Sequence, residues 1–223
     1  MLEAKKSETF EKIFAIYNKN LLKRKFHSVN ISGIENFKNL TLPTLIYVNH
    51  SSWWDGLIAF QISRFLNLNS FIMMEEKQLK NLQIFRRLGA FSIVRENSRE
   101  AFQSIEYAAK ILHANSRNTL WIFPQGKISP NDLRPFKFYN GLSHIVKKIE
   151  KCSVVPLALR YEFLGNFKPE VFIKADKPFI FDKNIGFTKK TITDSFSNRL
   201  EKLLDELKFD ITNNNVTNFR SIL

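Results

Sequence analysis

A histidine and an aspartate five residues apart are the residues in this sequence best suited to chemistry. Residues 49–55 read Asn-His-Ser-Ser-Trp-Trp-Asp and follow the apolar run 45–48, which is typical of a buried strand. At a strand-to-helix turn, an aspartate at the helix start can reach back to the imidazole. Asp55 would then fix the tautomer of His50, leaving the other ring nitrogen free to take a proton from a hydroxyl group. The simpler alternative is that Asp55 only caps the helix and His50 is an ordinary loop residue.

Cations follow three further strand-like runs of the chain. Arg95 follows the run 91–94, Lys127 comes shortly after 120–123, and Arg160 follows 154–159. A parallel sheet would gather these side chains at one edge, close to the His50 turn. Such a group of cations suits a phosphate, either of an acceptor lipid or of coenzyme A. The alternative, for each cation taken alone, is a solvated surface charge.

The elements that must position these residues alternate between strand-like runs and helical patterns. We predict helices over 56–65, 77–88, 99–113, 142–149 and 193–209, and strands over 29–34, 45–48, 71–74, 91–94, 120–123, 154–159 and 171–173. This alternation predicts an α/β fold with a mainly parallel central sheet flanked by helices.

The first 28 residues are predicted to form a helical appendage to one domain that spans residues 29–223. Residues 8–26 alternate apolar side chains with lysines and an arginine, the pattern of a basic amphipathic helix. Such a helix can lie in a membrane interface, or its apolar face can pack on the rest of the domain, and both can hold. No apolar run approaches the roughly 18 residues that a membrane-spanning helix needs.

Composition limits the classes of protein that remain. The chain has 223 residues, a net charge of +13, four histidines and one cysteine. A single cysteine argues against a disulfide scaffold and a cysteine-built zinc site. The sequence also lacks a Walker loop, a Gly-x-Ser-x-Gly elbow, a Gly-x-Gly-x-x-Gly motif and His-Glu-x-x-His. These absences argue against a nucleotide hydrolase, a common serine hydrolase, a nicotinamide enzyme and a zinc protease.

The positive charge is concentrated in one stretch. Residues 77–160 contain 15 Lys and Arg against 5 acids, so +10 of the total of +13 lies there. An excess of this kind suits an anionic partner, and base-stacking motifs that would indicate nucleic acid are not evident.

At these residues the chain resembles the glycerolipid acyltransferase family, whose best-known activity is the acylation of lysophosphatidic acid. Residues 49–55 are similar to the His-x-x-x-x-Asp motif, and residues 89–95 to a block that ends in a substrate-binding arginine. Residues 123–126, Phe-Pro-Gln-Gly, are similar to Phe-Pro-Glu-Gly, and residues 155–157 to a proline-containing block. The four blocks occur in the family's order, and the resemblance covers residues 28–175.

The resemblance implies a mechanism and a set of site residues. His50 removes the proton of an acceptor hydroxyl, Asp55 holds and charges His50, and the alkoxide attacks an acyl thioester directly. Acyl-CoA or acyl carrier protein is the co-substrate, no metal or other cofactor is required, and no nucleic acid is bound. The implied acceptor is a lysophospholipid such as 1-acylglycerol-3-phosphate, on the cytoplasmic face of a membrane such as a bacterial inner membrane, with the protein held peripherally or monotopically. The substrate-binding candidates are Arg95, Gln125, Gly126, Lys127, Ser52, Trp54 and Arg134.

The third block departs from the family pattern and leaves the acceptor open. The family usually has Glu, Thr and Arg where this chain has Gln125, Lys127 and Ile128, and Ile128 cannot bind phosphate. Lys127 or Arg134 could supply a cation instead. Another lysolipid, or a hydroxylated lipid without phosphate, is therefore an alternative acceptor. A non-catalytic module that binds anionic lipid and a thioesterase are alternative functions of other kinds.

Overall fold

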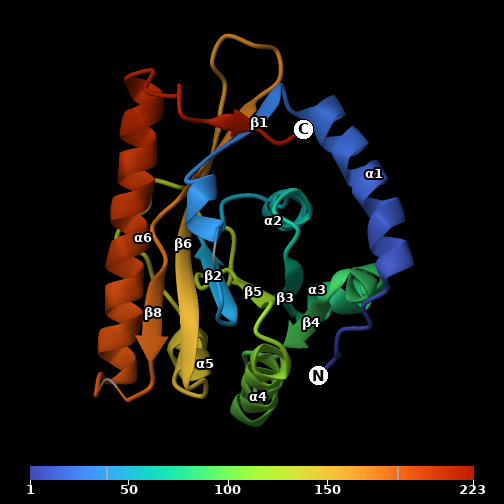
Figure 1. Cartoon of the computed structure of the whole chain (residues 1–223), viewed down its shortest axis with the longest axis vertical. Helices are drawn as coiled ribbons and strands as arrows, with labels where there is room; N and C mark the ends of the chain where they lie inside the picture. The colour runs from blue at the N-terminus through green and yellow to red at the C-terminus, as the bar shows by residue number, and fades with distance from the viewer. Residues whose placement is uncertain (39, 185) are drawn as a thin grey trace.

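A nine-stranded sheet forms the centre of the computed structural model, which describes residues 1–38, 40–184 and 186–223 (Figure 1). The strands are Ser28–Ser32 (β1), Thr44–Val48 (β2), Asn69–Glu75 (β3), Ala90–Ile93 (β4), Asn118–Ile122 (β5), Lys151–Glu162 (β6), Glu170–Ala175 (β7), Phe179–Asp182 (β8) and Arg220–Ser221 (β9). Their order is β4-β3-β5-β2-β6-β7-β1-β9, and β8 pairs with β6. The five neighbours from β4 to β6 are mutually parallel, whereas β6 pairs with β7 and β8 antiparallel.

Helices cover both faces of this sheet. They are Glu8–Lys25 (α1), Asp55–Phe65 (α2), Glu76–Asn81 (α3), Ser98–Ala114 (α4), Gly141–Val146 (α5) and Lys189–Thr212 (α6), with 3-10 turns at Ile34–Phe37 (η1) and Gln83–Leu88 (η2). Apolar side chains of α4, α5 and α6 form one core cluster with Leu45 and Tyr47 of β2. Ile46 and Val48 of the same strand face a second cluster that contains the apolar side of α2. Because β2 is buried on both faces, its continuous apolar run is what a central parallel strand requires.

The predicted α/β fold with a mainly parallel sheet is therefore confirmed, and most predicted elements lie where expected. The exception is the single helix predicted over 77–88. The structure instead has α3, a break at Leu82, and the 3-10 turn η2, because the chain must reverse there to enter β4. Gly89 ends η2 with a φ of 95°, and a Cβ at this residue would lie 2.6 Å from the carbonyl oxygen of Ser70. Strands β8 and β9 have no counterpart among the predictions.

Helix α1 packs against the domain along one side and leaves its other side exposed. Phe14, Asn18 and Leu22 are four residues apart and buried, and the Asn18 side-chain amide donates a hydrogen bond to the carbonyl oxygen of Leu57 in α2 (3.2 Å). Ile13, Ile16 and Tyr17 are exposed. Among the described residues, no helix is both long and apolar enough to cross a bilayer.

Candidate active site

His50 and Asp55 meet at the turn between β2 and α2. The Nδ1 atom of His50 lies 2.7 Å from Oδ2 of Asp55, and the Asp55 side chain is buried. A carboxylate only accepts hydrogen bonds, so Nδ1 carries the proton and Nε2 is left with a free lone pair. The backbone N–H groups of Ser51 and Ser52 donate to the same Oδ2 atom, at 2.7 and 2.9 Å. The sequence-based pairing of these two side chains is thus what the geometry shows.

Tyr161 is the third side chain of this cluster, and it is not among the residues predicted from the sequence. Its hydroxyl donates a 2.6 Å hydrogen bond to Oδ1 of Asp55, the oxygen that His50 does not use. Strand β6 continues beyond the end of β2, where Val48 pairs with Leu157, and this extension brings Tyr161 to the turn. Burial, followed by the nearby charge of Asp55, raises the pKa of Tyr161 well above its usual value. Tyr161 therefore stays protonated and acts as a donor.

Gln125 holds the backbone of His50 in place. Its side-chain carbonyl accepts a 2.6 Å hydrogen bond from the His50 N–H, and Gln125 is buried. The N–H of Ser129 donates to the His50 carbonyl oxygen at 2.8 Å. The Asn49 side chain bonds both the N–H and the carbonyl oxygen of Leu159 at 2.8 Å. The loop after β5 and the strand β6 together fix the turn that carries His50. Gln125 contributes to this through its side-chain carbonyl oxygen, which accepts the hydrogen bond from the His50 N–H.

An apolar cavity of about 390 Å³ opens beside His50. It extends between α2, β3 and η2, and its walls include Leu57, Phe60, Phe71, Met73, Phe85 and Ile93. His50, Arg95, Lys127 and Ile128 lie along the same cavity. An apolar cavity with a few convergent polar groups suits a ligand with a hydrocarbon chain and a polar reacting end.

Arg95 follows β4 and lines this cavity, but it is already engaged. Its Nη2 atom lies 2.7 Å from Oε2 of Glu75, and its Nη1 atom donates to the carbonyl oxygen of Gly126. The guanidinium also stacks over the Tyr139 ring, 5.0 Å from the centroid. Gly126 has a φ of 66°, and a Cβ there would lie 2.0 Å from Nη1 of Arg95, so any other residue would displace the guanidinium. Glu75 is the second residue that the sequence analysis missed.

The other two predicted arginines are also paired with acids. Arg160 is buried and contacts Glu162 through Nε (2.8 Å) and Asp132 through Nη1 (3.2 Å). The hydrogen bond from Arg160 is the main reason that the pKa of Asp132 is lowered. Arg134 contacts Asp205 of α6 at 2.5 Å and Glu201 at 3.8 Å. The sheet gathers cations at this edge as expected, but internal carboxylates neutralise the arginines, and Lys127 is exposed.

The two tryptophans of the turn have different positions. Trp53 is exposed and lines the cavity, whereas Trp54 packs edge-to-face against Phe26 at the end of α1 (5.3 Å between ring centroids). Trp54 therefore supports the turn from behind, and Trp53 is the one placed to meet a ligand. Ser52 acts locally, because its N–H donates to Asp55 and its hydroxyl oxygen accepts from the Trp54 N–H (3.2 Å).

Glu75 and Tyr161 both lie at the carboxyl ends of predicted strands, where functional side chains of a parallel sheet gather. Glu75 comes directly after the strand-like run 71–74, just as Arg95 comes after 91–94. Tyr161 follows Arg160 at the end of the run 154–159. Inspection of every polar residue after every strand, instead of the cations alone, would have found them.

Comparison with known proteins identifies a family and similar solved structures. The model of the Acyltransferase family matches residues 28–160, more than half of the chain. The crystal structure of PlsC, the 1-acyl-sn-glycerophosphate (LPA) acyltransferase from Thermotoga maritima, is similar with a TM-score of 0.65 and 20% sequence identity. The match covers 89% of this chain and 79% of that one. No curated protein sequence matches this chain significantly.

The family match spans the elements that build the site, from β1 through the turn with His50 and Asp55 to Arg160 in β6. The similar crystal structure has the same α/β architecture around a mostly parallel sheet. This chain belongs to the Acyltransferase family and is an acyltransferase.

Proposed function

We propose that this enzyme transfers a fatty acyl group from acyl-CoA or acyl carrier protein to the hydroxyl of a membrane lipid. The observation that carries the proposal is the bonded pair of His50 and Asp55 beside an apolar cavity. The cavity accommodates an acyl chain, and the free Nε2 atom of His50 faces the reacting groups. A lysophospholipid is the proposed class of acceptor. The reference acceptor for an assay is 1-acylglycerol-3-phosphate, the lipid after which the similar enzyme from Thermotoga maritima is named.

In the proposed reaction, Nε2 of His50 takes the proton of the acceptor hydroxyl as its oxygen attacks the thioester carbonyl. The tetrahedral intermediate collapses, the carbon–sulfur bond breaks, and the imidazolium returns the proton to the thiolate that leaves. Asp55 stabilises the imidazolium through Nδ1. Direct transfer fits the state of the single cysteine, because burial raises the pKa of Cys152 to about 12 and a thiolate is therefore not available there.

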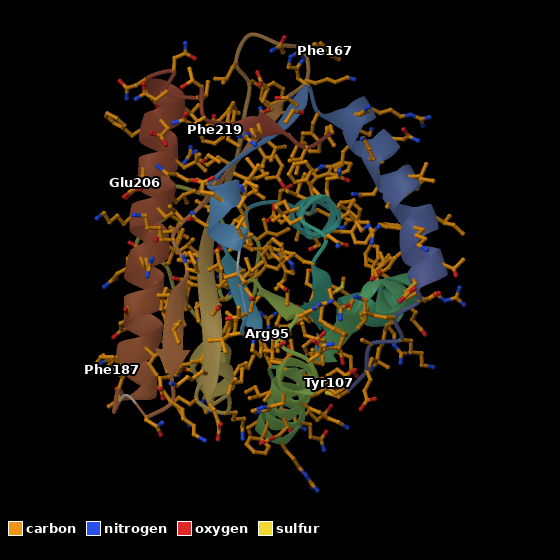
Figure 2. All side chains as sticks on the ribbon, viewed as in Figure 1. Arg95, Tyr107, Phe167, Phe187, Glu206 and Phe219 are labelled. Carbon is orange, nitrogen blue, oxygen red and sulfur yellow. The ribbon has the colours of Figure 1, made fainter. Side chains whose placement is uncertain are left out.

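We also propose that the enzyme works on the surface of an anionic membrane. The exposed face of α1 carries Ile13, Ile16 and Tyr17, and the hairpin between β6 and β7 has an apolar tip. This tip, formed by Phe163, Leu164 and Phe167, stands at one end of the molecule (Figure 2). Lys168 donates to the carbonyl oxygen of Lys23, so the hairpin and the end of α1 are neighbours.

The charges around these two elements support the same proposal. Within the described ranges, no carboxylate lies within ion-pair distance of six cations: Lys12, Lys19, Lys23, Arg24, Lys25 and Lys168. Unneutralised cations beside exposed apolar side chains suit the headgroups and acyl boundary of an anionic bilayer. Strand β6 runs parallel to β2 and past its end, so the apolar tip lies beyond the same sheet edge as His50.

The transfer assay uses the purified full chain, a labelled acyl thioester and a lysophospholipid in mixed micelles. We expect His50→Ala to lower kcat by at least about a thousandfold, since it removes the general base. His27→Ala, at an exposed histidine outside the site, is the control and should retain wild-type activity. Full activity of His50→Ala would contradict the mechanism. Release of free fatty acid without any acceptor would indicate a thioesterase, and lipid binding without turnover would indicate a non-catalytic module.

A further inference from the structure

The cavity beside His50 carries a carboxylate next to its arginine. Glu75 and Arg95 both line the cavity and pair at 2.7 Å between Oε2 and Nη2. The only other cation among the described residues that line this cavity, apart from the titratable His50, is the exposed Lys127. Because the charges of Glu75 and Arg95 cancel, the net charge of the cavity lining is about +1, from Lys127 alone.

The pair is fixed in place by its surroundings. The guanidinium of Arg95 donates to the Gly126 carbonyl oxygen and stacks on Tyr139, so it cannot swing away from Glu75 without breaking these contacts. The Oε1 atom of Glu75 has no hydrogen-bond partner among the described residues. Glu75 thus brings to the cavity lining a carboxylate oxygen that can still accept a hydrogen bond.

A phosphate monoester fits this arrangement poorly. It carries nearly two negative charges at neutral pH, and at Arg95 it would meet the Glu75 carboxylate within a few ångströms, where like charges repel strongly in a partly desolvated site. Arg134 and Arg160 offer no compensation, since neither lines this cavity and both are paired with their own acids. Ile128, which follows Lys127, presents an apolar side chain to the cavity.

We propose that Glu75 makes this enzyme select lipid acceptors without net charge and reject phosphate monoesters. Acceptors of this class are zwitterionic lysophospholipids, whose ammonium group can bind Glu75 while their phosphodiester faces Arg95, and uncharged lipid alcohols. This inference rests on the proposed acyl transfer. It removes the phosphate monoester 1-acylglycerol-3-phosphate from the proposed acceptors and adds uncharged lipid alcohols to them.

The test measures kcat/KM of the full chain for three acceptors in the same neutral micelles, with one labelled acyl thioester. The acceptors are lysophosphatidate, lysophosphatidylethanolamine and monoacylglycerol, which represent the dianionic, zwitterionic and uncharged arms. We expect the wild type to use at least one of the last two about tenfold better than lysophosphatidate, a discrimination worth about 1.4 kcal/mol. Whichever of these two lipids has the higher kcat/KM shows whether the acceptor is a zwitterionic lysophospholipid or an uncharged lipid alcohol.

The variant Glu75→Gln removes the carboxylate and keeps the side-chain shape. We expect it to raise kcat/KM for lysophosphatidate. The ratio of kcat/KM for the preferred acceptor to kcat/KM for lysophosphatidate should therefore fall by about tenfold. Glu75→Asp keeps the charge and should keep the wild-type ratio. Glu96→Gln, which removes an exposed carboxylate 3.9 Å from Lys77, is the matched control and should change nothing.

Several results would overturn the inference. A wild type that prefers lysophosphatidate, or a Glu75→Gln variant that loses activity equally on all acceptors, would show that Glu75 only orients Arg95. A folded Glu75→Gln variant with the wild-type ratio of kcat/KM values between acceptors would likewise show that Glu75 does not select the acceptor. Failure of wild type and variants with every acceptor would refute the proposed acyl transfer itself, and this inference with it.

Discussion

Tyr161 Oη and Asp55 Oδ1 lie 2.6 Å apart, so the carboxylate that holds the histidine is itself held from its far side. With the two backbone N–H groups and His50, Asp55 receives four hydrogen bonds in a buried position. A carboxylate bound in this way cannot rotate away from the imidazole. We therefore infer that Tyr161 is a positioning residue, which acts on the reaction through Asp55.

Replacing Tyr161 with Phe should change the pH dependence of the reaction as well as its rate. Without one of its donors, the Asp55 carboxylate binds the imidazolium more tightly, so the acid limb of the kcat/KM profile should move to higher pH. The rate should fall nevertheless, because the carboxylate is held by one hydrogen bond fewer and no longer fixes the orientation of the imidazole. A hydrogen bond to a charged group contributes about 1.5–3 kcal/mol, which corresponds to a fall in kcat of about tenfold or more. The measurement is the pH–rate profile of Tyr161→Phe beside the wild type.

Tyr107→Phe is the matched control for that variant. The Tyr107 hydroxyl also forms one hydrogen bond, which it accepts from the N–H of Ala4, but Tyr107 lies on α4 and does not line the cavity. We expect Tyr107→Phe to lower the thermal stability and to leave the pH profile in place. If both variants lose stability and neither shifts the profile, Tyr161 has only a packing role.

Gly126→Ala should displace the guanidinium of Arg95 and lower the activity of the enzyme. The new Cβ would lie 2.0 Å from Nη1 of Arg95, so the guanidinium must move and lose its bond to the Gly126 carbonyl oxygen. A non-glycine residue at a φ of 66° adds strain of about 1 kcal/mol. We expect kcat/KM to fall by at least about tenfold, as measured by steady-state kinetics.

Gly186→Ala is the corresponding control, since among the described residues no atom beyond its chain neighbours lies within 4 Å of the Cβ that it would add. It should leave both kinetics and stability at the wild-type level. Wild-type kinetics in Gly126→Ala would mean that Arg95 does not contribute to the reaction.

The apolar tip of the hairpin gives a prediction about membranes. Phe167 is 99% exposed, and a double substitution Phe163→Ser/Phe167→Ser should weaken partitioning into anionic vesicles by at least about tenfold, since two large apolar side chains no longer enter the interface. Cosedimentation with vesicles that contain anionic phospholipid measures this directly, and vesicles of zwitterionic lipid alone should bind less.

Phe187→Ser is the control, because Phe187 is also exposed but lies at the opposite end of the molecule from Phe167 (Figure 2). Equal binding of all variants would contradict the hairpin contact. An altered oligomeric state of the double variant, with unchanged vesicle binding, would instead make the tip an interface between copies of the protein.

Local patterns in the sequence were sufficient for the α/β class, for most helices and strands, and for the pairing of His50 with Asp55. These features depend on short-range periodicity and on a turn of six residues, which the chain itself specifies over a few neighbours. The break at Leu82 and the short strands β8 and β9 were not predictable in this way. They exist because of contacts with partners that lie far away along the chain.

The charges at the site differ between the sequence-based prediction and the folded structure. From the sequence, Arg95, Lys127 and Arg160 were expected at one sheet edge with a phosphate as their ligand, and Arg134 was a further candidate cation. The fold pairs the arginines Arg95, Arg134 and Arg160 with Glu75, Asp205 and Asp132, which are 20, 71 and 28 residues away. An ion pair depends on distances of a few ångströms between side chains, and only the packed chain sets those distances. The residue types and their order indicated acyl-transfer chemistry, whereas our proposal about the acceptor depends on the pairing of Arg95 with the distant Glu75, which only the folded chain creates.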